Sequence, residues 1–456
     1  MMRLSEIALA TKGQAIGVDV EVNSVGTDSR AIKEGQLFVA LKGENFDGHD
    51  YAKQSLHDGA SAVLVSREVA SPAVLVKDTK LALGELSAYW RNKFVMPVVA
   101  ITGSNGKTTV KEMLAAILKV AAGDAEKVLA TQGNLNNDIG LPLTMLKLNQ
   151  QHQYAVLEMG MNHTGELSYL TNLAKPNVAL VNNAGTAHIG ELGSVEAIAK
   201  AKGEIFEGLA EDGMAIINAD DVFADLWKTL AEKYKQMTFG LNAKADVTAK
   251  YVLHASSSEV ELLTPVGSVK FSLPAAGLHN VRNALAAASA AVALNVALDD
   301  IAKGLSGFAG VKGRLQAKQG FAGAKLIDDT YNANPMSMKA AIDVLKASPG
   351  QRIFVMGDMG ELGAGAPKMH AEIGAYAKDA GIEKLFALGT LTKNAVTAFG
   401  SNAAHFESVE ILADAIKQSM GTEVTVLVKG SRSMKMERVV DAIQAVKTNN
   451  SNGEKH

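Results

Sequence analysis

Residues 98–109 combine side chains and spacing that can hold the phosphates of a nucleotide. An apolar segment at residues 98–102 leads into a loop with two glycines and then into an amphipathic helix. Backbone N–H groups of such a loop and the positive end of the helix bind phosphate oxygens. A lysine in the loop adds a cation, and the threonine after it can reach Mg²⁺. The residues concerned are Gly103, Ser104, Asn105, Gly106, Lys107, Thr108 and Thr109.

The spacing of this loop is a variant, because Ile101 occupies the position of the usual first glycine. A glycine turn between a strand and a helix, with no ligand, is the alternative interpretation. The apolar strand, Lys107 and the helix occur together here, and that combination favours nucleotide binding.

Two residues that follow other apolar segments are candidates for the same centre. Glu158 ends the segment at residues 154–158, where a carboxylate can hold Mg²⁺ or pair with a loop amide. His188 follows a segment at residues 178–182, and its ring can bind a second Mg²⁺, contact phosphate or pack on backbone. Lys202 lies on a predicted helix after His188, where a solvated lysine is the ordinary interpretation.

Asparagines gather at two places along the chain. Asn134, Asn136 and Asn137 lie between two glycines, in a polar loop that can fix a ligand by hydrogen bonds or simply turn. Asn280 and Asn283 open an alanine-rich helix. An asparagine amide can pair with the edge of adenine, or it can cap the helix, and the sequence leaves both open.

A further group of polar residues lies beyond residue 313. Arg314 can reach across a cleft and neutralise phosphate charge, and Asp328 and Asp329 follow a strand, where carboxylates can bind ribose hydroxyls. Asn334 before Pro335 predicts a helix start. The other candidates for substrate binding in this part are Tyr331, Asn332, Asn334, Lys429 and Arg432. Near the N-terminus, two polar clusters can line a pocket or simply form loops, and they contain Ser29, Arg30, Asp47, Gly48 and His49.

The order of apolar segments predicts an α/β fold of three domains. Strands and helices alternate from residue 97 onward, which is typical of βαβ units and a parallel sheet. Residues 247–273 alternate apolar and polar side chains and predict a small antiparallel addition. We expect a small α/β domain at residues 1–85, a central phosphate-loop domain at 86–313 and a Rossmann-like domain at 314–456.

Composition excludes several classes of protein. The chain has 456 residues, a formal net charge of −3 and no cysteine, so general attraction to nucleic acid, disulfides and cysteine-held metals are not expected. The N-terminal residues have no long apolar core, and the alanine-rich helix is too weakly apolar to span a membrane. We therefore expect a soluble, cytoplasmic protein.

Taken together, these residues resemble the Mur ligase family, the ATP-dependent amide-bond ligases of peptidoglycan precursor synthesis. The features shared with the family are the loop at residues 102–109 with its variant spacing, and Glu158, His188, Lys202, Asn283 and Arg314. The segments 133–137, 329–335 and 357–363 are similar to those of the family member that adds D-alanyl-D-alanine. The Asn-Pro-Arg motif of the member that adds a diamino acid is not found in this sequence.

The resemblance implies that the first domain binds a UDP-N-acetylmuramoyl-tripeptide, with Ser29, Arg30 and residues 47–49 near the uridine diphosphate. The central domain would bind ATP and two Mg²⁺ ions, and the last domain would close with the D-alanyl-D-alanine dipeptide. Lys202 matches a lysine that can be carbamylated and then help to hold Mg²⁺. An acyl phosphate would form and be attacked by the dipeptide amine, in an enzyme expected to be a monomer.

Rival classes stay open at this point. A phosphate loop also occurs in nucleotide switches and motors, and a non-catalytic binding module is a further alternative. Polar clusters spread over three domains favour an enzyme with several substrates. Within the ligase class, a different acceptor amine is the serious alternative.

Overall fold

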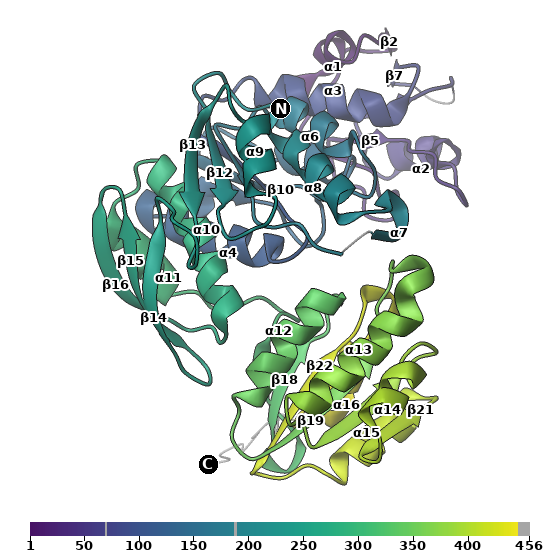
Figure 1. Cartoon of the computed structure of the whole chain (residues 1–456). Coiled ribbons are helices and arrows are strands. Elements are labelled where there is room, and N and C mark those ends of the chain that lie inside the picture. Colours follow the sequence, from purple (N-terminus) through teal and green to yellow (C-terminus); the bar gives the residue numbers. More distant parts are fainter. Residues whose placement is uncertain (69–70, 187–188, 446–456) are drawn as a thin grey trace, which may run out of the picture.

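The computed structural model describes residues 1–68, 71–186 and 189–445. Figure 1 shows an upper part, formed by the first two thirds of the chain, and a lower part formed by the last third, coloured green to yellow. His188, expected at the metal centre, lies outside the described residues. No helix in the described residues is long and apolar enough to cross a membrane.

The N-terminal part is a five-stranded sheet with helices packed against it. The strand order is β2-β7-β6-β5-β4, in which β2 is antiparallel to its neighbour and the other pairs are parallel. The central strands are buried on both faces and are therefore continuously apolar. The elements are β1 (Met2–Arg3), α1 (Leu4–Ala10), β2 (Gln14–Ile16), β3 (Glu21–Val22), β4 (Ser24–Gly26), β5 (Gln36–Val39), η1 (Gly48–Tyr51), α2 (Ala52–His57), β6 (Ala62–Val65), β7 (Ala73–Leu75) and α3 (Thr79–Arg91).

Helix α3 connects this sheet to the next one. Its apolar face packs on the N-terminal core, while Arg91 donates a hydrogen bond to the carbonyl of Ala174 at 2.9 Å. Lys80 pairs with Asp138 at 2.7 Å. The domain boundary expected at residue 85 falls inside helix α3. The division into domains at this point therefore stays a prediction.

The central part is a six-stranded parallel sheet in the order β13-β12-β11-β8-β10-β9. Helices α4, α10 and α11 cover one face, and α5, α6, α8 and α9 cover the other. The elements are β8 (Val98–Thr102), α4 (Lys107–Ala122), η2 (Ala125–Lys127), β9 (Val128–Ala130), α5 (Gly140–Met145), β10 (Tyr154–Glu158), α6 (Glu166–Ala174), β11 (Val178–Val181), α7 (Ile189–Leu192), α8 (Val195–Gly203), η3 (Glu204–Phe206), β12 (Met214–Asn218), α9 (Ala224–Leu230), β13 (Lys235–Phe239), α10 (Leu278–Ala293) and α11 (Leu298–Ser306).

A small antiparallel sheet lies between β13 and α10 in the sequence. It consists of β14 (Thr248–Leu253), β15 (Ser258–Thr264) and β16 (Gly267–Leu273). This sheet confirms the antiparallel addition predicted from the alternation at residues 247–273. Its inward side chains, such as Leu262 and Phe271, extend the core beneath α10.

The last third is a six-stranded sheet in the order β17-β18-β22-β19-β20-β21, parallel except for the antiparallel edge strand β17. Helices α12, α13 and α14 cover one face, and α15 and α16 cover the other. The elements are β17 (Gln316–Gln319), η4 (Phe321–Gly323), β18 (Lys325–Asp329), α12 (Pro335–Lys346), β19 (Gln351–Gly357), η5 (Gly363–Gly365), α13 (Ala366–Asp379), β20 (Lys384–Leu388), α14 (Lys393–Phe399), β21 (Ala403–Phe406), α15 (Val409–Lys417), β22 (Val424–Lys429), η6 (Arg432–Met434) and α16 (Glu437–Ile443).

Close packing of α13 on α14 yields a stability prediction. A Cβ added to Gly374 would lie 2.1 Å from the carbonyl oxygen of Ala395, which belongs to the backbone and cannot rotate away. We expect Gly374→Ala to destabilise the last third of the chain by about 1–3 kcal/mol, although alanine ordinarily favours a helix. Thermal unfolding should show a lower midpoint. Gly421→Ala, which would meet no atom within 4 Å, is the control, and equal midpoints for both variants would contradict the packing argument.

Candidate active site

The phosphate loop lies at the carboxyl end of β8, between the ends of β10 and β11. Its position is fixed from β11, because Ser104 donates its N–H to the carbonyl of Asn183 at 3.0 Å and Asn105 donates its N–H to Oδ1 of Asn183 at 2.8 Å. Asn182 and Asn183 return two side-chain hydrogen bonds to the carbonyl of Asn105. These hydrogen bonds hold the loop in a defined shape.

Gly106 is required at the point where the loop enters α4. Its φ is +79°, and a Cβ there would lie 2.4 Å from Oδ1 of Asn283 and 2.6 Å from Nδ2 of Asn182. Both observations exclude a side chain. A side chain at position 106 would therefore displace Asn283 and Asn182, which lie beside the loop.

Two lysines lie near each other beside the loop, the half-buried Lys107 and the buried Lys202. Lys107 curls back and donates to the carbonyl of Gly103 at 2.6 Å. Burial and the charge of Arg314 lower the pKa of Lys107, while Glu158 and Glu361 raise it. Burial, together with the nearby charge of Lys107, holds the pKa of Lys202 well below its ordinary value. Lys202 is only 2% exposed, so it is not the solvated lysine that its residue type suggested.

Glu158 offers an oxygen that no protein group satisfies. Its Oε1 accepts a hydrogen bond from Nδ2 of Asn136 at 2.8 Å, and its backbone N–H donates to the hydroxyl of Thr131. Its Oε2 is buried and has no hydrogen-bond partner. A buried, unsatisfied carboxylate oxygen beside a phosphate loop suits a divalent cation.

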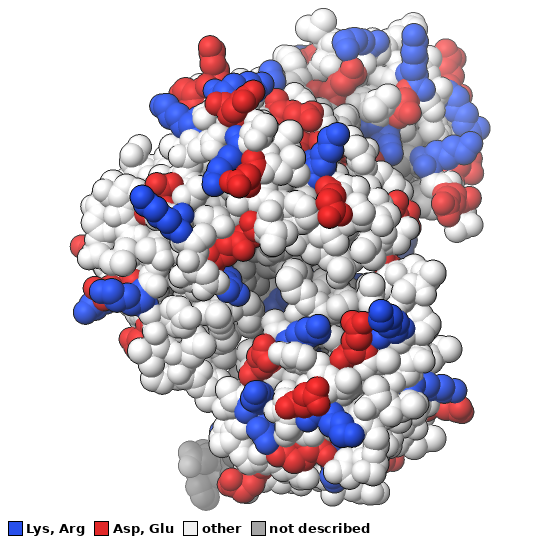
Figure 2. All heavy atoms as spheres, in the orientation of Figure 1, with Lys and Arg blue, Asp and Glu red and all other residues white. Residues whose placement is uncertain are grey.

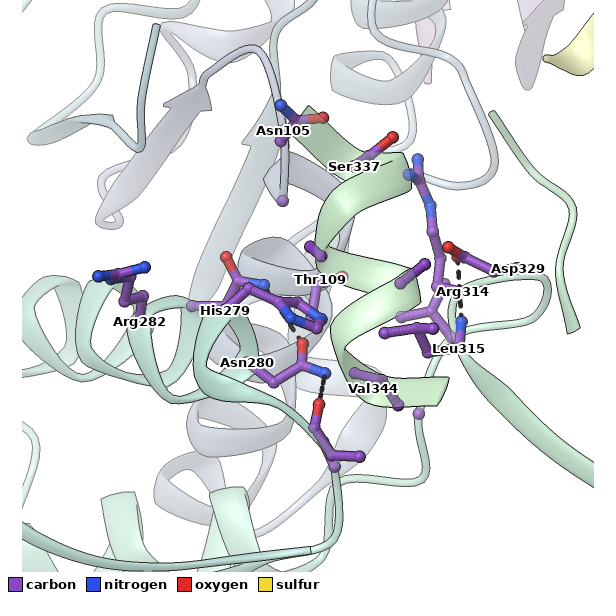
Figure 3. Close-up of a pocket in the computed structure, with 18 of the residues that line it drawn as sticks. Asn105, Thr109, His279, Asn280, Arg282, Arg314, Leu315, Asp329, Ser337 and Val344 are labelled. Carbon is purple, nitrogen blue, oxygen red and sulfur yellow. Dashed lines mark hydrogen bonds between the residues drawn. The ribbon is translucent and has the colours of Figure 1, made fainter. Parts of the chain in front are cut away.

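A pocket of about 640 Å³ extends from the loop to the last third of the chain (Figure 3). Figure 2 shows a hollow between the upper and lower parts, in which basic side chains are visible. The predicted residues that line the pocket are Asn105, Gly106, Thr109, Asn280, Asn283, Arg314, Asp329 and Lys429. Residues from two different sheets therefore form one site.

The wall contributed by α10 carries two asparagines whose amides are hydrogen-bonded to neighbouring protein groups. Asn283 donates to Oδ1 of Asn280 at 3.3 Å, and Asn280 donates to the carbonyl of Ala276 at 2.8 Å. Neighbouring His279 lines the same pocket, and burial lowers its pKa to about 4, so its ring is neutral at pH 7. Apolar side chains such as Phe308 and Val311 complete a surface that suits a planar base.

The wall contributed by the last third carries its charges in fixed positions. The guanidinium carbon of Arg314 lies 4.2 Å from the centre of the Tyr331 ring, and Nε of Arg314 is buried without a partner. Asp329 pairs with Lys429 at 2.7 Å and accepts the N–H of Leu315. Lys429 also donates to the carbonyl of Asn332 at 2.8 Å.

Two other candidates from this third are engaged outside the pocket. Asp328 pairs with Lys318 at 2.7 Å and accepts from the hydroxyl of Thr330. Arg432 is exposed and pairs with Glu437 at 3.0 Å.

The candidates near the N-terminus lie away from this pocket. Arg30 is exposed and pairs with Asp28, and Ser29 between them is half-buried. His49 is buried, with Nδ1 2.5 Å from Asp47 and Nε2 accepting the N–H of Ser66, so it supports the loop that begins at Gly48. Asn134 and Asn137 are exposed, whereas Asn136 reaches Glu158.

Several residues of the site escaped the sequence-based prediction. Asn182 and Asn183 hold the loop, and His279 and Asp220 line the pocket. The pair of asparagines follows an apolar strand, and polar residues at the carboxyl ends of parallel strands are the usual ligand contacts. This rule was applied to Glu158 at the end of β10. Applied in the same way to the residues after β11, it would have predicted Asn182 and Asn183.

Comparisons with known proteins find matches over most of the chain. Residues 21–91 match the Mur ligase family catalytic domain, 101–291 the Mur ligase middle domain and 313–432 the Mur ligase glutamate ligase domain. The chain belongs to the Mur ligase family, and it is an ATP-dependent ligase.

Three individual proteins are similar to this chain over nearly its whole length. The UDP-N-acetylmuramoyl-tripeptide–D-alanyl-D-alanine ligase of Escherichia coli is 45% identical over 97% of this chain and 98% of its own length. A crystal structure of MurF from Acinetobacter baumannii, 38% identical, superposes with a TM-score of 0.91 over 97% of this chain and 98% of that one. MurF ligase from Thermotoga maritima in complex with ADP, 28% identical, gives 0.82 over 92% and 97%.

The crowding around Gly106 predicts the effect of a minimal substitution. Gly106→Ala would force its methyl group against Asn283 and Asn182 and require a strained φ. We expect nucleotide affinity to fall at least tenfold, while the thermal midpoint falls only slightly. Equilibrium titration with ADP measures the affinity, and Gly421→Ala again serves as the control. Unchanged affinity in Gly106→Ala would contradict this account of the loop.

Proposed function

We propose that this protein joins D-alanyl-D-alanine to UDP-N-acetylmuramoyl-tripeptide and converts ATP to ADP and phosphate. The observation that carries the proposal is that one pocket combines the phosphate loop with Arg314, Asp329 and Lys429 from another sheet. A ligase must bring a nucleotide and two further substrates together, whereas a nucleotide switch needs the loop alone. The names of the relatives supply the particular substrates.

The nucleotide would bind with its phosphates along residues 103–109 and its base against α10. Loop N–H groups and the helix end would hold phosphate oxygens, as would Lys107 once it leaves the Gly103 carbonyl. Arg314 would neutralise charge that develops on the transferred phosphoryl group. Asn280, Asn283 and Asp329, with Asp328 as a further candidate, would contact the base and ribose.

The residues present fit a divalent cation. Glu158 has a buried unsatisfied oxygen, and Thr108 lies at the start of α4. Mg²⁺ bound there would neutralise phosphate charge. His188 is proposed for a second ion by family resemblance alone, because it lies outside the described residues.

Lys202 is suited to carbamylation. Its lowered pKa leaves a fraction of neutral amine, whose nitrogen can attack the carbon of CO₂ and then lose a proton. The product carries one negative charge in place of a positive one. That exchange removes the repulsion between Lys202 and Lys107 and adds an oxygen ligand for Mg²⁺.

The reaction follows from these positions. A carboxylate oxygen of the tripeptide attacks the γ-phosphorus as the bond to ADP breaks, which gives an acyl phosphate. The neutral amine of the dipeptide then attacks the acyl carbon, the bond to phosphate breaks, and phosphate leaves with the proton that the nitrogen loses as the amide forms. Approach of the last third excludes water from the acyl phosphate, with residues 310–313 as the proposed hinge.

The remaining substrate contacts are proposals by resemblance. Ser29, Arg30 and residues 47–49 would hold the uridine diphosphate, and Asn134, Asn136 and Asn137 the sugar-peptide. Tyr331, Asn332, Lys429 and Arg432 would face the dipeptide, whereas the hydrogen bonds of Asn334, the other candidate in this group, favour a different role. We further propose domains at residues 1–85, 86–313 and 314–456, and a monomeric enzyme that acts in the cytoplasm, where ATP and nucleotide-linked precursors occur.

Product analysis tests the acceptor. With ATP, Mg²⁺ and UDP-N-acetylmuramoyl-tripeptide, we expect phosphate release only when D-alanyl-D-alanine is added, with a matching gain in mass of the nucleotide product. A panel of single amino acids is the control. Release with a single amino acid and a shorter peptide would identify another ligase of the family, and release without any acceptor would contradict the mechanism.

Carbamylation has its own test. We expect Lys202→Ala to lower kcat at least a hundredfold, because a ligand and its negative charge are lost, and short carboxylates such as formate to restore part of the activity. Lys200→Ala, an exposed lysine two residues away, is the control. Full activity of Lys202→Ala without any added carboxylate would exclude a role for the carbamate.

A further inference from the structure

A hydrogen bond between two asparagine side chains joins the phosphate loop to the last third of the chain. Nδ2 of Asn334 donates to Oδ1 of Asn105 at 2.8 Å, across 229 positions of sequence. Nearby, the Met336 side chain lies against Gly185, where an added Cβ would come within 2.6 Å of its Cε. The start of α12 is therefore seated directly on the loop that binds phosphate (Figure 3).

The direction of this hydrogen bond is fixed at one end by a helix cap. Oδ1 of Asn334 accepts the N–H of Ser337 at 3.0 Å, as the N-cap of α12. Only the oxygen of the amide can accept that bond, so the NH₂ group must face the other way, toward Asn105. Asn334 is buried, and both ends of its amide are occupied, one by Ser337 and the other by Asn105.

The other partner in this hydrogen bond, Asn105, has one side-chain polar group that a ligand can still satisfy. Its Oδ1 is taken by Asn334, and its backbone is held by Asn182 and Asn183. Its Nδ2 is buried, has no hydrogen-bond partner, and belongs to a residue that lines the nucleotide pocket. A buried amide donor without a partner loses the hydrogen bonds that water would give it, so an acceptor from a ligand is favoured there.

We propose that Asn334 is a positioning residue that acts through Asn105, so that Nδ2 of Asn105 is presented to a phosphate oxygen of the nucleotide. The inference rests on the proposed binding of ATP to this loop. Phosphate oxygens only accept hydrogen bonds, so the phosphate and Asn334 select the same orientation of the Asn105 amide. Nucleotide binding and the seating of α12 on the loop then stabilise each other.

The test separates this role from contact with the dipeptide. Asn334→Ser keeps a residue that caps helices well but cannot reach Asn105. We expect its affinity for ADP, measured without the other substrates, to fall about fivefold or more, with a higher KM for ATP. The KM for D-alanyl-D-alanine at saturating ATP should stay within twofold of wild type. Loss of dipeptide affinity alone would overturn the proposal.

A double-mutant cycle identifies the route of the effect. Asn105→Ala should weaken ADP binding by itself, and adding Asn334→Ser to it should cause no further loss. Additive effects would show that Asn334 does not act through Asn105. Asn334→Asp keeps the cap and places an acceptor opposite Asn105, so it should weaken ADP binding more than Asn334→Ser does.

Folding and the parent proposal are checked separately. Ser408→Ala removes the cap of α15, on the opposite face of the same sheet, and should leave ADP affinity unchanged. Thermal midpoints of the Asn334 variants close to that of wild type show that the fold persists. If wild-type protein fails to bind ADP, the proposed nucleotide binding is wrong. If wild-type protein binds ADP and the Asn334 variants bind it equally well, only the positioning role of Asn334 is wrong.

Discussion

The site depends on one geometric constraint, that parallel strands end together at one edge of their sheet. In the central sheet this edge places the phosphate loop after β8 between Glu158 at the end of β10 and Asn182 after β11, and Asn182 hydrogen-bonds to the loop. In the last sheet it gathers Asp329 and Lys429. The two edges face each other across a single pocket, so residues far apart in sequence become neighbours without any long loop.

The charged side chains at this edge favour the binding of anions. Lys107, Lys202, Arg314 and Lys429 stand close together, and burial lowers the pKa of the three lysines. Such an arrangement destabilises the empty protein and is relieved by phosphate or by carbamylation. Asp329 and Glu158 compensate part of it, which explains why these carboxylates are buried with the cations.

Sequence alone could predict the elements whose patterns are strong. The strand, loop and helix that begin at residue 98 are confirmed, as are the N-cap at Asn334 and the antiparallel addition at residues 247–273. The edge strands β17 and β21 were missed, since they are only partly buried and lack an apolar run. Local spacing also could not show that Lys202 is buried, or that Asn105 meets Asn334, because both facts arise from how separate sheets pack.

In the alanine-rich helix α10, residues that do not line the pocket also determine where the pocket residues lie. Small side chains such as Ala287 and Ala291 are wholly buried and allow its backbone to lie close to α4. A larger residue there would move the whole helix outward, and Asn280 and Asn283 would move with it. Tolerance to mutation is therefore expected to be low along a face that never touches a ligand. During divergence of such enzymes, this spacer helix would accept fewer changes than the exposed loops around the pocket.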